Sequence, residues 1–185
     1  MSTLEVNKIT PSTGTGVTLG DSGDTFTIPS GVTITNNGTQ TGFGGSNTPA
    51  FSAYLSSNQT ISGSTLTTIA FDTENFDSDS CYNTSTYRFT PTEAGKYLLF
   101  ANTRVTTTAN QTSTFEMEIR HSVQNSILRI SGHTQEQTTW SGSVIATMNG
   151  TSDFVFVSFY HTESSSTLDA GNGDTLFGGF KLIGA

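Results

Sequence analysis

The sequence predicts an all-β fold, and its composition supports this prediction in three ways. About a third of the residues are Ser or Thr, well above the usual share, while only 12% are charged. The chain also holds 13 Phe and 5 Tyr among many Val, Ile and Thr, which pleated strands favour. No long run has the three- and four-residue apolar spacing of a helix. The low apolar content of 32% therefore indicates polar strands rather than disorder.

The first segment, residues 1–45, contains short pieces in which apolar and polar residues alternate between Gly and Pro. Each piece is too short to bury a face alone, so we expect it to pair with neighbouring turns or neighbouring chains. A β-rich shaft or a strand-exchanging collar would supply such partners, and a floppy tail is the alternative. The side chains predicted to form this attachment segment are Leu4, Val6, Ile9, Val17, Leu19, Phe26 and Ile28.

The Gly-rich stretch that follows predicts a hinge, with a linker at 46–49 and a head domain at 50–185. Longer strand patterns begin at residue 50, and turn signals separate them at the intervals of a β-sandwich. The predicted strands are 50–55, 65–71, 86–90, 95–106, 114–121, 126–132, 138–148, 153–161 and 175–183. They are enough for a two-sheet jelly roll.

The run from Phe154 to Tyr160 is apolar on both faces of the predicted strand. A strand in an antiparallel sandwich needs only one buried face, so the second face predicts a symmetric subunit interface. Trp140, the only Trp, is expected in the core, although an exposed Trp could stack on a sugar ring. The aromatic residues assigned to the core or to a trimer interface are Phe51, Phe71, Phe76, Tyr87, Phe89, Phe154, Phe156, Phe159, Phe177 and Phe180.

Four motifs of the head domain occur in a particular order. They are Ala50-Phe51-Ser52-Ala53, Phe71-Asp72 before Asn75-Phe76-Asp77, Tyr87-Arg88-Phe89-Thr90-Pro91 before Gly95-Lys96-Tyr97, and Phe177-Gly178-Gly179-Phe180-Lys181-Leu182-Ile183. From about residue 50 to 183, the chain resembles the globular head of complement component 1q and its tumour-necrosis-factor relatives. The resemblance implies a ten-stranded jelly roll, a tight homotrimer, and binding rather than catalysis.

The opening residues, MSTLEVNKITPSTGTGVTL, resemble the N-termini of tail-fibre and other virion appendage proteins of marine bacteriophages. In those proteins a Leu-x-Val-Asn-x-Ile opening precedes Gly- and Thr-rich repeats. This resemblance implies a place on a virus particle without saying which part of the particle.

The charge balance excludes some classes of partner. A net charge of -8 and scattered basic residues argue against nucleic acid. Cys81 is the only cysteine, so no disulfide within the chain and no Cys-based zinc site is expected. The N-terminus has no signal-peptide pattern and no stretch is long enough to span a membrane, so we expect synthesis in a host cytoplasm.

Catalysis is not expected. The three histidines, His121, His133 and His161, stand near predicted strand ends, where structural roles are the rule. Glu116 and Glu118 face the same side of one predicted strand, which indicates a wet strand face more simply than a glycosidase pair. No cofactor or metal is expected, and calcium would need more regular oxygen ligands than one acidic cluster supplies. That cluster, expected to be a solvated loop, comprises Asp72, Glu74, Asp77 and Asp79.

These observations predict a homotrimeric phage tail-fibre or appendage head that attaches through its N-terminal segment and binds the host surface. A capsid decoration or cement protein is the alternative, a secreted lectin-like head is disfavoured, and a polysaccharide-degrading enzyme is a remote alternative. Polar loops at 106–114 and 163–174 suit a glycan or protein partner, or are simply soluble loops. The receptor contact itself is unknown.

Overall fold

The protein is a two-sheet jelly roll, as seen in a computed structural model that describes residues 9–35, 37, 47–107, 113–133 and 137–183. The chain divides into two units, Met1–Thr41 and Gly42–Ala185, which are treated separately below. Every strand pairing is antiparallel and none of the described residues lies in a helix, so the predicted all-β fold is confirmed. Accordingly, the described part of the chain contains no helix that could cross a membrane.

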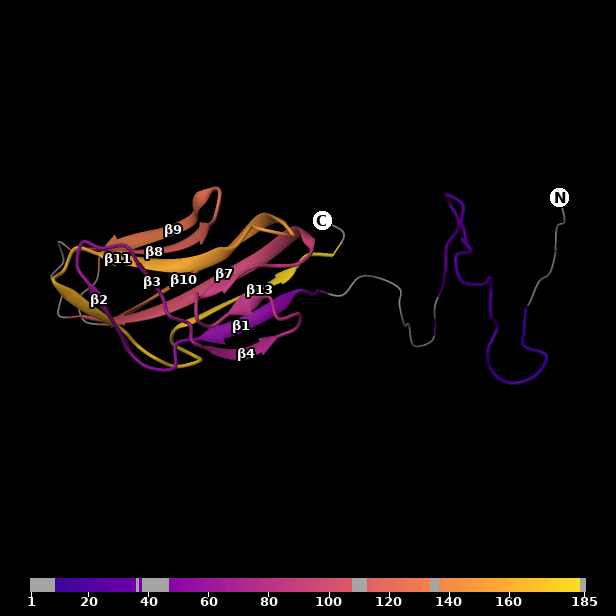
Figure 1. Ribbon diagram of the computed structural model, residues 1–185, viewed down its shortest axis with the longest axis horizontal. Coiled ribbons are helices and arrows are strands. Elements are labelled where there is room, and N and C mark those ends of the chain that lie inside the picture. The colour runs from indigo at the N-terminus through magenta and orange to yellow at the C-terminus, as the bar shows by residue number, and fades with distance from the viewer. Residues whose placement is uncertain (1–8, 36, 38–46, 108–112, 134–136, 184–185) are drawn as a thin grey trace. The chain divides into compact units, whose positions relative to one another are not determined.

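The seven-stranded sheet is built around one long strand. Its strands are β1 (Ala50–Tyr54), β2 (Gln59–Ser62), β4 (Thr73–Asp77), β7 (Ala94–Thr106), β10 (Gln137–Asn149), β12 (Ser165–Leu168) and β13 (Leu176–Lys181). β10 pairs with β7 along its whole length, while β12 and β13 share the opposite edge of β7. β1 and β4 then extend the sheet beyond β13 (Figure 1).

The six-stranded sheet forms the second layer. Its strands are β3 (Thr67–Thr68), β5 (Tyr82–Asn83), β6 (Arg88–Phe89), β8 (Thr114–His121), β9 (Asn125–His133) and β11 (Val155–His161). β11 is central, since β8 pairs with one edge and the short β3 and β6 pair with the other. In Figure 1, β8 and β9 lie above β13, β1 and β4.

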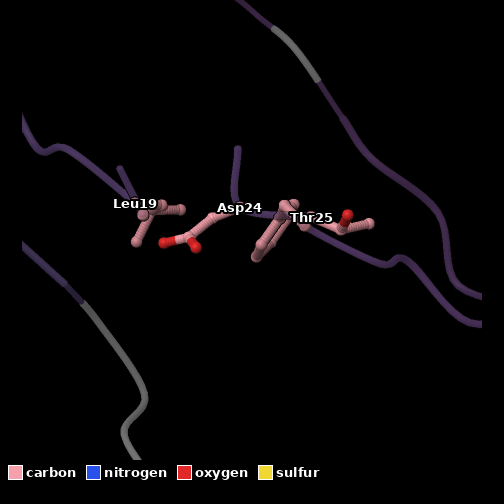
Figure 2. Close-up of a pocket in the computed structure, with 5 residues that line it drawn as sticks. Leu19, Asp24 and Thr25 are labelled. Atoms are coloured by element: carbon pink, nitrogen blue, oxygen red, sulfur yellow. The ribbon is translucent and has the colours of Figure 1, made fainter. Parts of the chain in front are cut away.

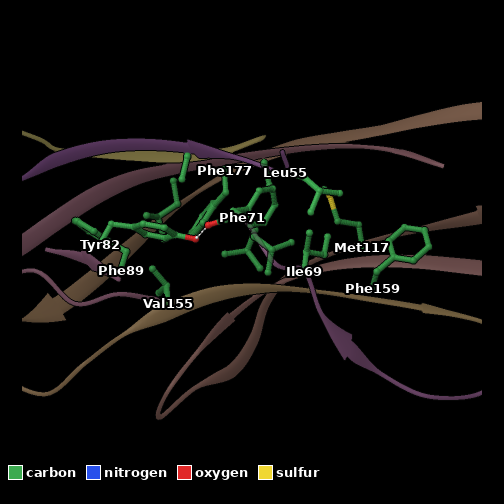
Figure 3. Packing of buried hydrophobic residues seen from close by; sticks show 14 of the residues in the cluster. Leu55, Ile69, Phe71, Tyr82, Phe89, Met117, Val155, Phe159 and Phe177 are labelled. Carbon is green, nitrogen blue, oxygen red and sulfur yellow. Dashed lines mark hydrogen bonds between the residues drawn. The ribbon is translucent and has the colours of Figure 1, made fainter. Parts of the chain in front are cut away.

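The core fills the space between the sheets because side chains alternate along each strand. On β7, Tyr97, Leu99 and Ala101 are buried, while the residues between them point outward. Phe51 stacks on Phe89 with ring centroids 4.3 Å apart, and other aromatic and aliphatic side chains continue this packing (Figure 3). Trp140 belongs to this core, as predicted.

Most predicted strands are confirmed, and the differences have local causes. The predicted strand 65–71 shrinks to β3 because the Gln59 side chain accepts a hydrogen bond from Ala70 N and donates one to Thr68 O. The predicted strand 86–90 begins only at β6, since Tyr87 has a φ of 59° and its N–H donates to Asn83 O in a tight turn. Four strands were not predicted, namely β2, β4, β5 and β12. Each is short and polar enough to lack a clear alternation.

In the N-terminal unit the predicted β-rich segment does not form within a single chain. No strand is assigned to residues 9–35, although two turns are closed there, by Asp24 N to Asp21 O and by Val32 N to Pro29 O. The predicted apolar side chains are exposed, with Phe26 at 68%. Leu4 and Val6 lie outside the described residues. Pieces of three residues find too few partners in their own chain to pair as strands.

Candidate functional site

The outer face of the seven-stranded sheet carries a continuous set of apolar side chains. Strand register places Ala50, Phe180, Leu98 and Ile145 in one row across β1, β13, β7 and β10. A second row holds Phe76 and Phe100 on either side of two small residues. Residues opposite each other in neighbouring strands share a face, so the two rows adjoin. We term this set the apolar band, which comprises Ala50, Phe76, Leu98, Phe100, Ile145 and Phe180.

The described parts of the head domain leave the apolar band at least partly exposed. Phe76 and Ile145 are 54% and 57% exposed, and the other four are half-buried. The band runs from the edge strand β4, which holds Phe76, to the edge strand β10, which holds Ile145. Contiguous apolar surface that crosses a whole sheet is typical of an interaction site.

Gly178 fixes the place of the Phe100 ring within this band. A Cβ built at Gly178 would lie 2.5 Å from Phe100 Cζ and 3.0 Å from Phe51 O. The end of the Phe100 ring therefore lies over Gly178, where an added Cβ would displace it. Phe100 thus covers the middle of the outer face.

The other end of the same face is polar and already bonded. Arg104 Nη1 lies 2.8 Å from Asp174 Oδ1, and its Nε lies 3.4 Å from Asp169 Oδ2. The hydrogen bond with Asp174 raises the pKa of Arg104, which stays charged. Asn102 Nδ2 donates to Asp174 O at 2.7 Å. The boundary of the apolar band is thus set by a network that ties residues 169–174 to β7.

A second feature of this sheet is the outer edge of β10, the edge that does not pair with β7. β10 has 13 residues and forms a strand pair with β7 alone among the described residues. Its sequence, QTTWSGSVIATMN, has no charged residue and no Pro. Long edges without such protection are templates for association, and proteins normally cover or charge them.

The outer face of the six-stranded sheet has a different chemistry, because it carries a charge cluster. Glu118 is only 1% exposed, and its two carboxylate oxygens lie 2.6 Å from Arg120 Nη1 and 2.5 Å from Arg129 Nη2. Arg129 Nε also lies 3.8 Å from Glu116 Oε2. We term Glu116, Glu118, Arg120 and Arg129 the charge cluster, which has no net charge.

The charge cluster corrects the prediction of a wet strand face at Glu116 and Glu118. The two carboxylates do face the same side of β8, but Glu118 is buried and held by two arginines. Both oxygens of the Glu118 carboxylate are taken up by these ion pairs, which does not suit a glycosidase pair. No group of His, Cys, Asp and Glu that could hold a metal occurs among the described residues. The predicted acidic loop is in part strand β4.

The second face of β11 is partly covered within the chain, so its apolar run does not by itself require another subunit. Phe154, which precedes β11, lies 6.0 Å from Phe156 between ring centroids, and the Arg88 guanidinium stands 4.1 Å above its ring. Ser158 is buried opposite Glu118. Both aromatic residues are half-buried by these neighbours.

The three histidines occupy strand ends, as predicted. His121, His133 and His161 end β8, β9 and β11, respectively. His121 Nδ1 accepts from Val123 N at 3.1 Å, and His161 Nε2 lies 2.9 Å from Ile61 O. These contacts hold turns and strand ends together, which is a structural role.

The structure separates the predicted aromatic set into three groups. Phe51, Phe71, Phe89, Phe159 and Phe177 are fully buried in the core. Phe76 and Phe180 belong to the apolar band, and Tyr87, Phe154 and Phe156 are half-buried elsewhere. The sequence reasoning missed Leu98, Phe100 and Ile145. The doubly apolar run 97–101 on β7 was the signal that could have found the first two.

A hollow in the N-terminal unit offers little chemistry. It is lined by Leu19, Gly20, Asp24, Thr25 and Phe26 (Figure 2). These residues come from one turn and its flanks, and the Asp24 carboxylate already accepts a hydrogen bond from Asp21 N at 2.8 Å. The hollow is therefore the inner side of a turn.

The head domain was compared with known protein families and solved structures. Residues 50–182 match the family model for the C1q domain. The globular domain of zebrafish complement 1qA protein has a TM-score of 0.54 at 16% identity, covering 72% of this chain and 97% of that one. Eiger TNF from S. frugiperda has a TM-score of 0.57 at 11% identity, with 74% and 95% covered. Murine APRIL has a TM-score of 0.57 at 12% identity, with 72% and 99% covered. No curated protein matches the sequence.

Proposed function

The chain belongs to the C1q domain family, and on that premise we propose that it is the homotrimeric head of a bacteriophage virion appendage. It attaches to the particle through its N-terminal segment and binds the host surface with its head. Domains of this family are generally binding or structural rather than enzymatic, and they typically form homotrimers. The phage context is supported by the resemblance of the N-terminal sequence to virion appendage proteins.

The apolar band is the observation that carries the proposed trimer. It crosses the seven-stranded sheet from β4 to β10, so its two ends lie on different edge strands. A contact in which the β10 edge of one copy packs on the sheet face of the next is head-to-tail. Such a contact must close into a ring to avoid an open fibre. Three copies close the ring and cover both the apolar band and the unprotected edge.

A trimer also suits the proposed binding role. The described residues of the head offer polar loops, and no group of His, Cys, Asp and Glu among them could hold a metal. Contacts between polar loops and a host surface are individually weak, and the three copies in a trimer multiply them through avidity. The protein is then located on the virion surface after synthesis in a host cytoplasm.

Two measurements test this function together. Light scattering at several concentrations is expected to give a constant native mass of three chains, and a stable monomer would contradict the trimer. Purified protein is expected to compete with particles for adsorption to host cells. Failure to compete, together with a high copy number per particle, would favour a capsid decoration protein, because cement is present in large multiples.

A further inference from the structure

The N-terminal unit presents apolar side chains that its own chain leaves uncovered. Between residues 9 and 35 the exposed large apolar residues are Ile9, Val17, Leu19, Phe26, Ile28, Val32 and Ile34. The last six form three pieces of one pattern, Val-Thr-Leu, Phe-Thr-Ile and Val-Thr-Ile. Each piece has an apolar residue on both sides of a central Thr. In an extended strand the two apolar side chains would point one way and the Thr the other.

The turns between these pieces are already formed. Asp24 N donates to Asp21 O, and Asp21 N donates to Asp24 Oδ2 at 2.8 Å. Gly20 and Gly23 have φ values of 82° and 97°, which other residues rarely adopt. Val32 N donates to Pro29 O, with Gly31 at a φ of 84°. The chain therefore reverses at set positions while the pieces between the turns lack strand partners.

We infer that residues 17–34 form a three-chain β-structure whose partners are the same segment of two further copies. This inference rests on the proposed homotrimer, since three heads bring three such segments together at high effective concentration. A three-fold arrangement gives each piece two neighbours and leaves no free edge. It also turns Val17, Leu19, Phe26, Ile28, Val32 and Ile34 toward a shared axis.

The low charge of residues 17–34 is compatible with pairing between identical chains. Asp21 and Asp24 are the only charged residues between 9 and 35, and both lie in one turn. The three pieces are uncharged, so identical copies meet there without like-charge repulsion. The central residues Thr18, Thr27 and Thr33 would then form the hydroxyl-rich outer surface.

Hydrogen exchange on the full chain tests the inference, with native mass measured on the same sample. Slow exchange is expected for backbone amides of residues 17–34 in a protein of three-chain mass. Phe26→Asp places a charge toward the axis and is expected to speed that exchange at least tenfold. Thr27→Asp adds the same charge to the same piece on the opposite side, and is expected to leave exchange slow. Both variants are expected to keep the mass of three chains through the head.

The outcomes separate this inference from the proposed function. Rapid exchange at 17–34 in a three-chain protein would overturn the inference and leave the trimeric head intact. Slow exchange that Phe26→Asp does not change, or that appears only with added virion proteins, would also overturn it. A single-chain native mass would overturn the proposed homotrimer, and the inference with it.

Discussion

The two outer sheet faces of the head follow the same pleat, yet charged side chains pair across one of them and apolar side chains cross the other. On the six-stranded sheet the charge cluster pairs its members, and Arg88 covers Phe154. On the seven-stranded sheet the apolar band is half-buried or exposed, and β10 forms a strand pair with β7 alone among the described residues. The difference teaches that outward apolar residues indicate an interface when they adjoin one another across several strands, and less so when paired charges lie beside them.

The largest effect is expected from a charge in the apolar band. Phe100→Asp puts a carboxylate at the centre of the proposed contact in all three copies, and each copy would lose about 2 kcal/mol or more. The expected result is a folded monomer by light scattering, with an unchanged circular dichroism spectrum. Val123→Asp is the control, since Val123 is an exposed apolar residue in the β8–β9 turn, away from the apolar band. A trimer that survives Phe100→Asp would remove the distinction between the two faces.

A second prediction concerns the charge cluster, which should matter for folding and not for assembly. Replacing Arg120 and Arg129 together by Met leaves the buried Glu118 carboxylate unpaired. The expected cost is about 3–5 kcal/mol in the free energy of unfolding. Denaturant titration measures it, and the protein that is still folded should keep the native mass of wild type. The single change Arg129→Met should cost less, since Arg120 still pairs with Glu118. A selective loss of the trimer would place the interface on this face instead.

The smallest effect is expected from Tyr97, which lies on the core side of β7, opposite the apolar band. Burial raises the pKa of Tyr97 from 10.0 to about 12, and its hydroxyl donates to Glu93 O at 2.7 Å. The unfolded chain loses this proton near pH 10, whereas the folded chain keeps it until about pH 12. Stability should therefore fall as pH rises through this window, and Tyr97→Phe should reduce the fall. An equal decline in the Phe variant would show that another group is responsible.

Sequence patterns predicted most of the head, but the site only in part. The long strands β7, β8 and β10 were predicted nearly to their ends because their alternation extends over eight or more residues. Phe76 and Phe180 were assigned to core or interface without deciding between them. Ile145 was missed because it joins Leu98 and Phe180 in one row only when β7, β10 and β13 are aligned.

The attachment segment shows the opposite balance. Its alternation was visible in the sequence, and the turns at 20–24 and 29–32 follow from Gly, Asp and Pro. Strands did not follow, since a strand needs a partner and three-residue pieces find too few within one chain.

By itself the sequence determined which residues of each long strand point inward, where the chain turns, and which family the head belongs to. These features are local, because alternation and turn chemistry act over a few neighbouring residues. Only the tertiary structure decided which neighbours the outward side chains have. Glu118 is buried in an ion pair with Arg129 of the neighbouring strand, and the Phe100 ring lies over Gly178 of another. Strand order and register are set by contacts between segments that are distant in the sequence. Those contacts determine whether the outward side chains of a sheet pair with one another or form an apolar surface.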